Sequence, residues 1–366
     1  MKKIETVLIK PASSLCNLDC DYCFYKDEAA HRSQACTPVM NEETIRSILL
    51  NFLPAAETLS VCFQGGEPMM AGLDWFKRFV AIAAEMNEKG KTVINYSIQT
   101  NGTLIDQAWC DFLKENRFLV GVSFDGFPML HNIHRGHSGS KVLESIRLMI
   151  RNDVQFNIVC VVTNEIVENL PSVWNYFMEK GLIYLQFIPC MNPIQNPGKD
   201  FLDAQLYGQF LCFIFEKWYD AIINSRPVFI RHIENFLQIM LEGHAEQCDV
   251  NGVCSAQYVI ESDGSVYPCD FFCTDSYLLG NININHDDLA QVDQRREELK
   301  FIESSVSSNP ECADCVARVF CNGGCRRNRT SDGRFRFCES YRFFAIRERK
   351  LIENVINYYS AAIRKK

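Results

Sequence analysis

Short hydrophobic runs alternate with amphipathic segments along the first half of the chain. The runs occupy residues 6–10, 59–63, 93–98, 118–124, 156–162 and 184–188, and each has the length and composition of a buried strand. Residues 75–86, 107–113, 142–150 and 170–178 carry hydrophobic side chains at helical spacing, and Asn41 can cap a further helix that ends before Pro54. This alternation predicts an α/β fold with a parallel sheet and right-handed crossovers, and six such units fit a partial or complete barrel. We expect a partial (β/α)6 TIM-like barrel.

The character of the chain changes in its last third. Residues 206–241 are predicted to be helical, and residues 341–363 form a predicted final helix. Between them the chain is rich in Cys, Gly, Asp and Asn, and Asp263-Gly264 predicts a hairpin within ESDGSVYPC. We therefore place a boundary near residue 240, with a barrel domain in residues 1–240 and a Cys-rich domain in residues 241–366.

Polar or small residues follow five of the six predicted strands, in the segments CNLDCDYC, QGGEP, QTNG, SFDG and IPCMN. The carboxyl ends of parallel strands meet at one edge of an α/β fold, where its ligands bind. These five segments are therefore expected to converge on one site.

Composition and charge limit the classes of protein. The chain has 366 residues, of which 47% are hydrophobic and 22% charged, so it is not a disordered chain. A formal net charge of −8 argues against a nucleic-acid-binding protein. No run approaches the length of a membrane span, and the early apolar run is too short for a signal peptide, so a cytoplasmic protein is expected.

The chain contains 18 cysteines, and reduced cytoplasmic thiols are either metal ligands or buried side chains. Cys62, Cys160 and Cys212 lie in apolar runs and are predicted to be core thiols. Three other cysteines form a CxxxCxxC motif after the first predicted strand: Cys16, Cys20 and Cys23. Three thiolates suit an iron–sulfur cluster with one open iron, whereas structural zinc normally needs a fourth ligand.

CNLDCDYCFY followed by QGGEP resembles the radical S-adenosylmethionine superfamily. That resemblance implies a 4Fe–4S cluster whose open iron chelates S-adenosylmethionine, from which a 5′-deoxyadenosyl radical is generated. The pair Gly65-Gly66 is expected to let the backbone approach the ligand closely.

Eight cysteines beyond residue 247 resemble the SPASM auxiliary-cluster domain, which implies two more 4Fe–4S clusters. The resemblance implies Cys248, Cys254, Cys269 and Cys325 as ligands of one cluster. It implies Cys312, Cys315, Cys321 and Cys338 as ligands of the other. A pair of zinc sites is the alternative. Six nearby arginines either offset the cluster charge or form a solvated basic face: Arg318, Arg326, Arg327, Arg329, Arg334 and Arg336.

The segments LIKPASS, CFQGGEP, QTNGTLID, FNIVCVVT, LQFIPC and VIESDGSVYPCDFF are similar to the anaerobic sulfatase-maturating enzymes. The similarity implies oxidation of an active-site Cys or Ser of a sulfatase to Cα-formylglycine, with a C/S-x-P-x-R-like substrate segment. It makes Asp270 the proton acceptor and the auxiliary clusters the electron acceptor. A turn or cluster-supporting role is the alternative for Asp270.

The same family implies five contacts to S-adenosylmethionine: Tyr22, Gly66, Ser123, Arg135 and Met191. Gln64 and Asp125 are expected to face the same cavity, and Tyr25 to lie near the substrate or to be structural. An electron donor such as flavodoxin or ferredoxin is the expected partner. The competing interpretations are a SPASM enzyme that forms thioether or carbon–carbon crosslinks and a non-enzymatic electron carrier. A preference between Cys-type and Ser-type sulfatases stays open.

Overall fold

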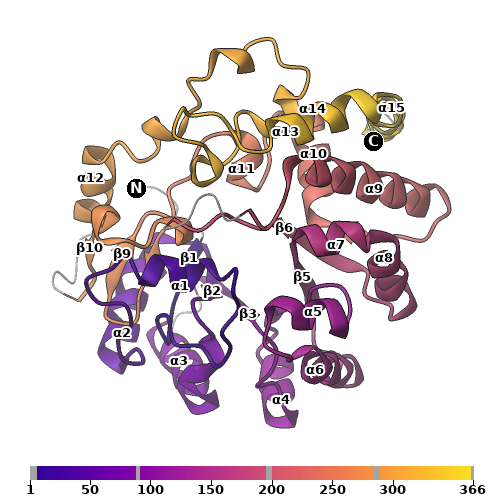
Figure 1. The fold of residues 1–366 in the computed structure, drawn as a ribbon. Helices are drawn as coiled ribbons and strands as arrows, with labels where there is room; N and C mark the ends of the chain where they lie inside the picture. The colour runs from indigo at the N-terminus through magenta and orange to yellow at the C-terminus, as the bar shows by residue number, and fades with distance from the viewer. Residues whose placement is uncertain (1–5, 88–90, 195–199, 284–288, 364–366) are drawn as a thin grey trace.

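Seven parallel strands in chain order form most of the sheet. The computed structural model describes residues 6–87, 91–194, 200–283 and 289–363. The strands are β1 Thr6–Ile9, β2 Thr58–Phe63, β3 Val93–Thr100, β4 Leu119–Ser123, β5 Phe156–Val162, β6 Tyr184–Pro189 and β7 Phe229–Ile230. Each strand pairs with the next in the chain, so the row curves as an open, partial barrel (Figure 1). The six predicted strands are confirmed, with bounds that differ by at most two residues.

Helices connect the strands and surround the curved sheet (Figure 1). They are α1 Phe24–Ala29, α2 Glu42–Phe52, α3 Leu73–Met86, α4 Gln107–Glu115, α5 Pro128–His134, α6 Gly139–Arg151, α7 Asn164–Glu168 and α8 Leu170–Glu179. The predicted cap of α2 is confirmed, because the Asn41 side chain accepts a hydrogen bond from the Thr44 amide at 2.9 Å.

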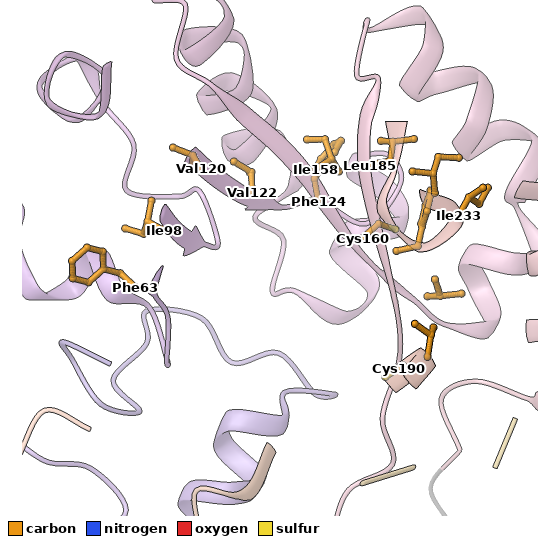
Figure 2. Close-up of a cluster of buried hydrophobic side chains, with 14 of the residues drawn as sticks. Phe63, Ile98, Val120, Val122, Phe124, Ile158, Cys160, Leu185, Cys190 and Ile233 are labelled. Atoms are coloured by element: carbon orange, nitrogen blue, oxygen red, sulfur yellow. The ribbon is translucent and has the colours of Figure 1, made fainter. Parts of the chain in front are cut away.

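Alternating side chains of the strands form the core. Figure 2 shows Phe63, Ile98, Val120, Ile158 and Leu185, which come from five successive strands. All five are at most 3% exposed. Two of the three predicted core thiols, those of residues 160 and 212, are fully buried, and the thiol of residue 62 is partly buried. The burial of alternating side chains thus fixes which face of each strand points into the core.

The prediction of one helical stretch over residues 206–241 is wrong. The chain forms two helices there, α9 Ala204–Ile223 and α10 Arg231–Glu242, with β7 between them. Ser225 has φ +54°, a left-handed conformation that ends a helix. Pro227 follows and has no amide hydrogen to continue the helix. The final helical region likewise divides at Glu348 into α14 Cys338–Arg347 and α15 Arg349–Ile363.

The Cys-rich region extends the barrel sheet. The predicted hairpin is confirmed as β8 Val259–Ile260 and β9 Ser265–Tyr267, joined through Gly264 at φ +87°. β8 pairs in parallel with β1, and β10 Gly280–Asn281 follows β9 at the sheet edge. The sheet therefore crosses the boundary predicted near residue 240, which itself stays a prediction.

Short helices complete the Cys-rich region: α11 Cys248–Asn251, α12 Leu289–Glu298 and α13 Arg318–Cys321. α14 packs along α9, and α13 lies near α11 (Figure 1). None of the helices in the described ranges is long and apolar enough to cross a membrane.

Candidate active site and metal centres

The loop after β1 carries the first three candidate ligands, Cys16, Cys20 and Cys23. Two backbone hydrogen bonds hold this loop against the turn after β2, from Gly66 N to Ser13 O at 2.9 Å and from Glu67 N to Leu15 O at 2.7 Å. A Cβ atom on Gly66 would lie 2.3 Å from the carbonyl oxygen of Leu15. Glycine is required here because the turn touches the cysteine loop, which is a different close approach from the ligand contact expected from the sequence.

The three thiols share one electrostatic environment. Burial raises the pKa of the Cys20 thiol to about 11; nearby Arg135 lowers it, while Cys23 and Cys16 raise it. The sulfur of Cys16 accepts hydrogen bonds from the Leu18 amide at 3.4 Å and from the Asn101 side chain at 3.8 Å. Hydrogen bonds of this kind support thiolates that bind iron, and metal binding supplies the driving force for losing the thiol proton.

The remaining eight candidate ligands fall into two groups in space. Burial raises the pKa of Cys248 to about 12, and Asp249, Cys325 and Cys254 raise it further. Burial raises the pKa of Cys269 well above its ordinary value, and Cys325 and Cys248 raise it further. We call Cys248, Cys254, Cys269 and Cys325 the proximal set, because it includes the neighbour of Asp270.

In the second group, burial raises the pKa of Cys321 to about 12, with a contribution from Cys338, Cys315 and Cys312. These four side chains line one hollow in the surface together with Gly323. We call them the distal set. The grouping coincides with the two ligand sets that the SPASM resemblance implies, although the assignment of each ligand stays a proposal.

All eleven candidate donors are cysteine thiols, the ligands that iron–sulfur clusters take, so the donor sets fit such clusters.

The arginines of the Cys-rich region divide into two kinds. Arg327 and Arg336 are half-buried and donate hydrogen bonds to the carbonyl groups of Asn192 and Cys190, which fastens the Cys-rich region to the loop after β6. Arg334 is more exposed and pairs with Glu339 at 2.6 Å. A solvated basic face therefore does not describe this set as a whole.

A pocket beside the first cysteine loop contains two of the five predicted S-adenosylmethionine contacts. Tyr22 and Met191 line it together with Cys20 and Cys23. Its empty volume, counted with its open mouth, is about 660 Å³. Ser123, at the end of β4, is buried, and its hydroxyl accepts a hydrogen bond from the Gln99 side chain at 3.2 Å.

Asp125 organises the neighbouring groups instead of facing the cavity with free oxygens. One carboxylate oxygen accepts from Arg135 Nε at 2.7 Å and from the Tyr22 hydroxyl, and the other accepts from the Val161 amide at 2.8 Å. Burial opposes its ionisation, but Arg135 and His131 hold the pKa of Asp125 below its ordinary value. The Arg135 guanidinium also lies over the Tyr22 ring at 5.3 Å. Asp125 thus fixes the positions of two predicted cofactor contacts.

Asp270 lies in a short turn directly after Cys269 and is 9% exposed. Its carboxylate accepts from the Tyr25 hydroxyl at 2.6 Å, and Lys10 Nζ is 3.1 Å from its other oxygen. The Tyr25 hydroxyl is also 3.0 Å from Gln64 Oε1. Lys10, directly after β1, and Tyr25, on α1, therefore meet at Asp270, and Gln64, directly after β2, contacts Tyr25.

Sequence reasoning missed the charged groups around Lys10. Burial opposes protonation of Lys10, yet Cys273, Asp270 and Glu261 raise its pKa well above the ordinary value. Glu261 lies 3.4 Å from Lys10 and 2.5 Å from Arg32. The only signal available was a lysine at the end of an apolar strand, because its partners are more than 250 residues away in the chain.

A second unpredicted carboxyl group is that of Glu28 on α1, which is buried. Burial raises its pKa to about 8, and Lys10 and Arg327 lower it. In the described part of the chain, neither of its carboxylate oxygens has a hydrogen-bond partner. Burial of Glu28 thus favours the protonated form of its carboxyl group.

Comparisons with known proteins agree with this geometry. The radical SAM superfamily model matches residues 11–170, and the iron-sulfur cluster-binding domain model, SPASM, matches residues 248–316. A cysteine-type anaerobic sulfatase-maturating enzyme of Clostridium perfringens is 40% identical over 93% of this chain and 95% of its own length. The chain belongs to the anaerobic sulfatase-maturating enzyme family.

Two further members of this family show its breadth. A serine-type enzyme of Klebsiella aerogenes is 31% identical over 93% of this chain and 84% of its own length. The solved structure of native anSMEcpe with bound AdoMet and Cp18Cys peptide is 37% identical, has a TM-score of 0.89, and covers 97% of this chain and 99% of its own. The family assigns this chain 4Fe–4S clusters and S-adenosylmethionine as cofactors, which confirms what the resemblance implied.

Proposed function

We propose that this enzyme oxidises an active-site Cys or Ser of a sulfatase to Cα-formylglycine. Its relatives are cysteine-type and serine-type anaerobic sulfatase-maturating enzymes, and one related structure holds a peptide. The observation that carries the proposal is the position of Asp270, a buried carboxylate directly after the candidate ligand Cys269 and bonded to Tyr25 and Lys10.

The reaction removes two electrons and two protons from the CH₂–SH or CH₂–OH group of the substrate. A serine gives the aldehyde directly, whereas a cysteine gives a thioaldehyde that water hydrolyses to the aldehyde with release of hydrogen sulfide. When bound, S-adenosylmethionine and its cluster supply the abstraction of one hydrogen atom from Cβ, and the auxiliary clusters supply an acceptor for the second electron. Cys16, Cys20 and Cys23 would hold the first cluster, and the proximal and distal sets would hold the other two.

The protein side chains supply the proton transfer and the orientation. Asp270 accepts the proton from the substrate heteroatom. The Tyr25 hydroxyl and Lys10 Nζ hold the carboxylate in a fixed orientation at 2.6 and 3.1 Å. Asp125 fixes Arg135 and Tyr22, and Arg135 is suited to pair with the carboxylate of S-adenosylmethionine.

The partner is proposed to be a sulfatase segment resembling C/S-x-P-x-R, with electrons delivered by a flavodoxin or ferredoxin. The cysteine-type relatives are 36–40% identical and the serine-type relatives 31%, which favours a cysteine-type substrate. No nucleic-acid or membrane partner is proposed, and a cytoplasmic location stays a prediction.

The test is mass spectrometry of C-x-P-x-R and S-x-P-x-R peptides after anaerobic incubation with reconstituted protein, S-adenosylmethionine and reductant. We expect an aldehyde on the first peptide at a higher rate than on the second. A thioether product without aldehyde favours the crosslinking alternative, and absence of 5′-deoxyadenosine with intact clusters contradicts the enzyme proposal altogether.

Asp270→Asn tests the proton acceptor, with Asp74→Asn as the matched control because the Asp74 side chain is fully exposed. The Asp270 variant should retain its iron and lose at least about 100-fold in formylglycine formation, the ordinary contribution of a general base. Formation at the rate of the Asp74 control removes Asp270 from the mechanism.

A further inference from the structure

The guanidinium group of Arg329 is anchored without a carboxylate. It donates to three main-chain carbonyl groups, from Nε to Gly323 at 3.0 Å, from Nη2 to Gly324 at 2.7 Å and from Nη1 to Ser305 at 2.7 Å. Across the described ranges, no carboxylate forms an ion pair with it. The neighbouring Arg334 and Arg342, by contrast, each pair with glutamates.

These three carbonyl groups place Arg329 between the proximal and distal sets. Gly323 and Gly324, whose carbonyl groups it binds, lie in the chain between Cys321 of the distal set and Cys325 of the proximal set. Ser305 belongs to the same support, because its hydroxyl accepts a hydrogen bond from the Cys254 amide at 2.8 Å. Arg329 is therefore fixed to the backbone that carries ligands of both clusters.

The charge of Arg329 acts on both sets as well. Burial lowers the pKa of Arg329, and it is raised by Cys325 and Cys254 of the proximal set and by Cys312 of the distal set, whose thiolate forms carry the opposite charge. An arginine side chain stays protonated at every physiological pH. The positive charge between the two sets is therefore permanent.

We propose that Arg329 raises the reduction potentials of both auxiliary clusters together. A cluster with four thiolate ligands is more negative after reduction than before it, so a fixed positive charge nearby stabilises the reduced state more than the oxidised state. Because Arg329 is half-buried and has no carboxylate to neutralise it, this effect is less screened than that of a paired surface arginine. Arg329 thus makes both clusters better electron acceptors, and it acts as a tuning residue that does not touch substrate.

This inference rests on the proposed ligand sets. Arg329→Gln removes the charge, Arg329→Lys retains it with fewer carbonyl contacts, and Arg349→Gln is the matched control, because Arg349 is exposed and its partner Glu353 lies one helical turn away on α15. Each protein is reconstituted with all three clusters and titrated anaerobically with EPR detection, which gives a midpoint potential for each cluster independently of activity.

We expect Arg329→Gln to lower the midpoint potentials of both auxiliary clusters beyond any shift in the Arg349 control, and to leave the cluster of the first cysteine loop unchanged. Arg329→Lys should keep both potentials at the wild-type values. The proposal is overturned if both potentials in Arg329→Gln match the control, or if Arg329→Lys lowers them as much as Arg329→Gln does.

Assembly failure is distinguishable from failure of the proposal. If Arg329→Gln does not retain its iron, Arg329→Lys decides, because lowered potentials in that charge-retaining variant overturn the proposal and wild-type potentials support it. A wild-type protein with fewer than three clusters contradicts the ligand sets themselves. The formylglycine assay is independent of both results.

Discussion

The ion pair between Asp125 and Arg135 offers a quantitative test of how the cofactor pocket is built. Asp125→Asn keeps the size of the side chain and the main-chain hydrogen bond from the Asp125 amide to His131 Nδ1 at 3.2 Å. It removes the negative charge that faces Arg135, whose guanidinium is 7% exposed and has its pKa raised by Asp125 against the effect of burial. Arg135 is left as a buried cation without its carboxylate.

The expected magnitude follows from this geometry. Removing one partner of a buried ion pair destabilises a protein by about 3–5 kcal/mol, and the lower end applies because asparagine still accepts hydrogen bonds. A loss of about 3 kcal/mol lowers the melting temperature by roughly 4 °C for a chain of 366 residues, because the unfolding entropy is about 2.1 cal/mol/K per residue. The effect is far larger than that of an exposed pair such as Arg349 and Glu353.

The assay is anaerobic thermal unfolding of Asp125→Asn, Arg135→Gln and the double variant, followed by the near-ultraviolet circular dichroism of cluster-loaded protein. Since each single change strands the other charge, the double variant should be destabilised by much less than the sum of the single variants. Additive changes in melting temperature, or a loss below about 2 °C in Asp125→Asn, would refute the account of the pair.

Three further variants test other parts of the structure. Burial lowers the pKa of His232 to about 4, so the folded state binds fewer protons than the unfolded state below about pH 6.5. Stability should therefore fall as the pH drops from about 6.5 toward 4. In thermal unfolding, His232→Gln should reduce this dependence of stability on pH. Gly66→Ala places a Cβ atom against the Leu15 carbonyl group and should abolish iron binding by the first cysteine loop alone. The measurement is the iron content, which should fall by about one third. Retention of all the iron contradicts the close contact. Lys10→Met leaves Asp270 without its cation and should reduce formylglycine formation by at least about 10-fold at unchanged iron content, so equal rates would assign Lys10 a purely structural role.

Local patterns made much of the fold predictable. The strand runs, the Asn41 cap and the Asp263-Gly264 turn each depend on a few consecutive residues, and all of them are present in the structure. The prediction failed where a local interruption was overlooked, as at Ser225, where a left-handed residue before a proline divides a continuous helical pattern.

The candidate site divides in the same way. The cysteines could be found from sequence because iron–sulfur motifs have short, regular spacing and follow strand ends. The pairing of Lys10 with Glu261 could not be found from sequence, because a buried lysine is recognisable only from the carboxylates around it. These carboxylates follow strands that become neighbours only through the fold. Asp125 was found but its role was not, since its hydrogen bonds arise from three separate segments.

The pairing of β8 with β1 has a consequence for attempts to exchange parts between members of this family. β1 leads into the first cysteine loop, and the β8–β9 hairpin leads to Cys269 and Asp270, so hydrogen bonds of one sheet set the distance between the two regions. A chimera joined at residue 240 would take β8 from one parent and β1 from the other. Mismatched side chains would then meet where the two strands pair, next to Lys10 and Glu261. A graft that keeps residues 1–283 from one parent leaves this strand pairing intact and exchanges the distal set as a whole, although Cys325 of the proximal set is then supplied by the other parent.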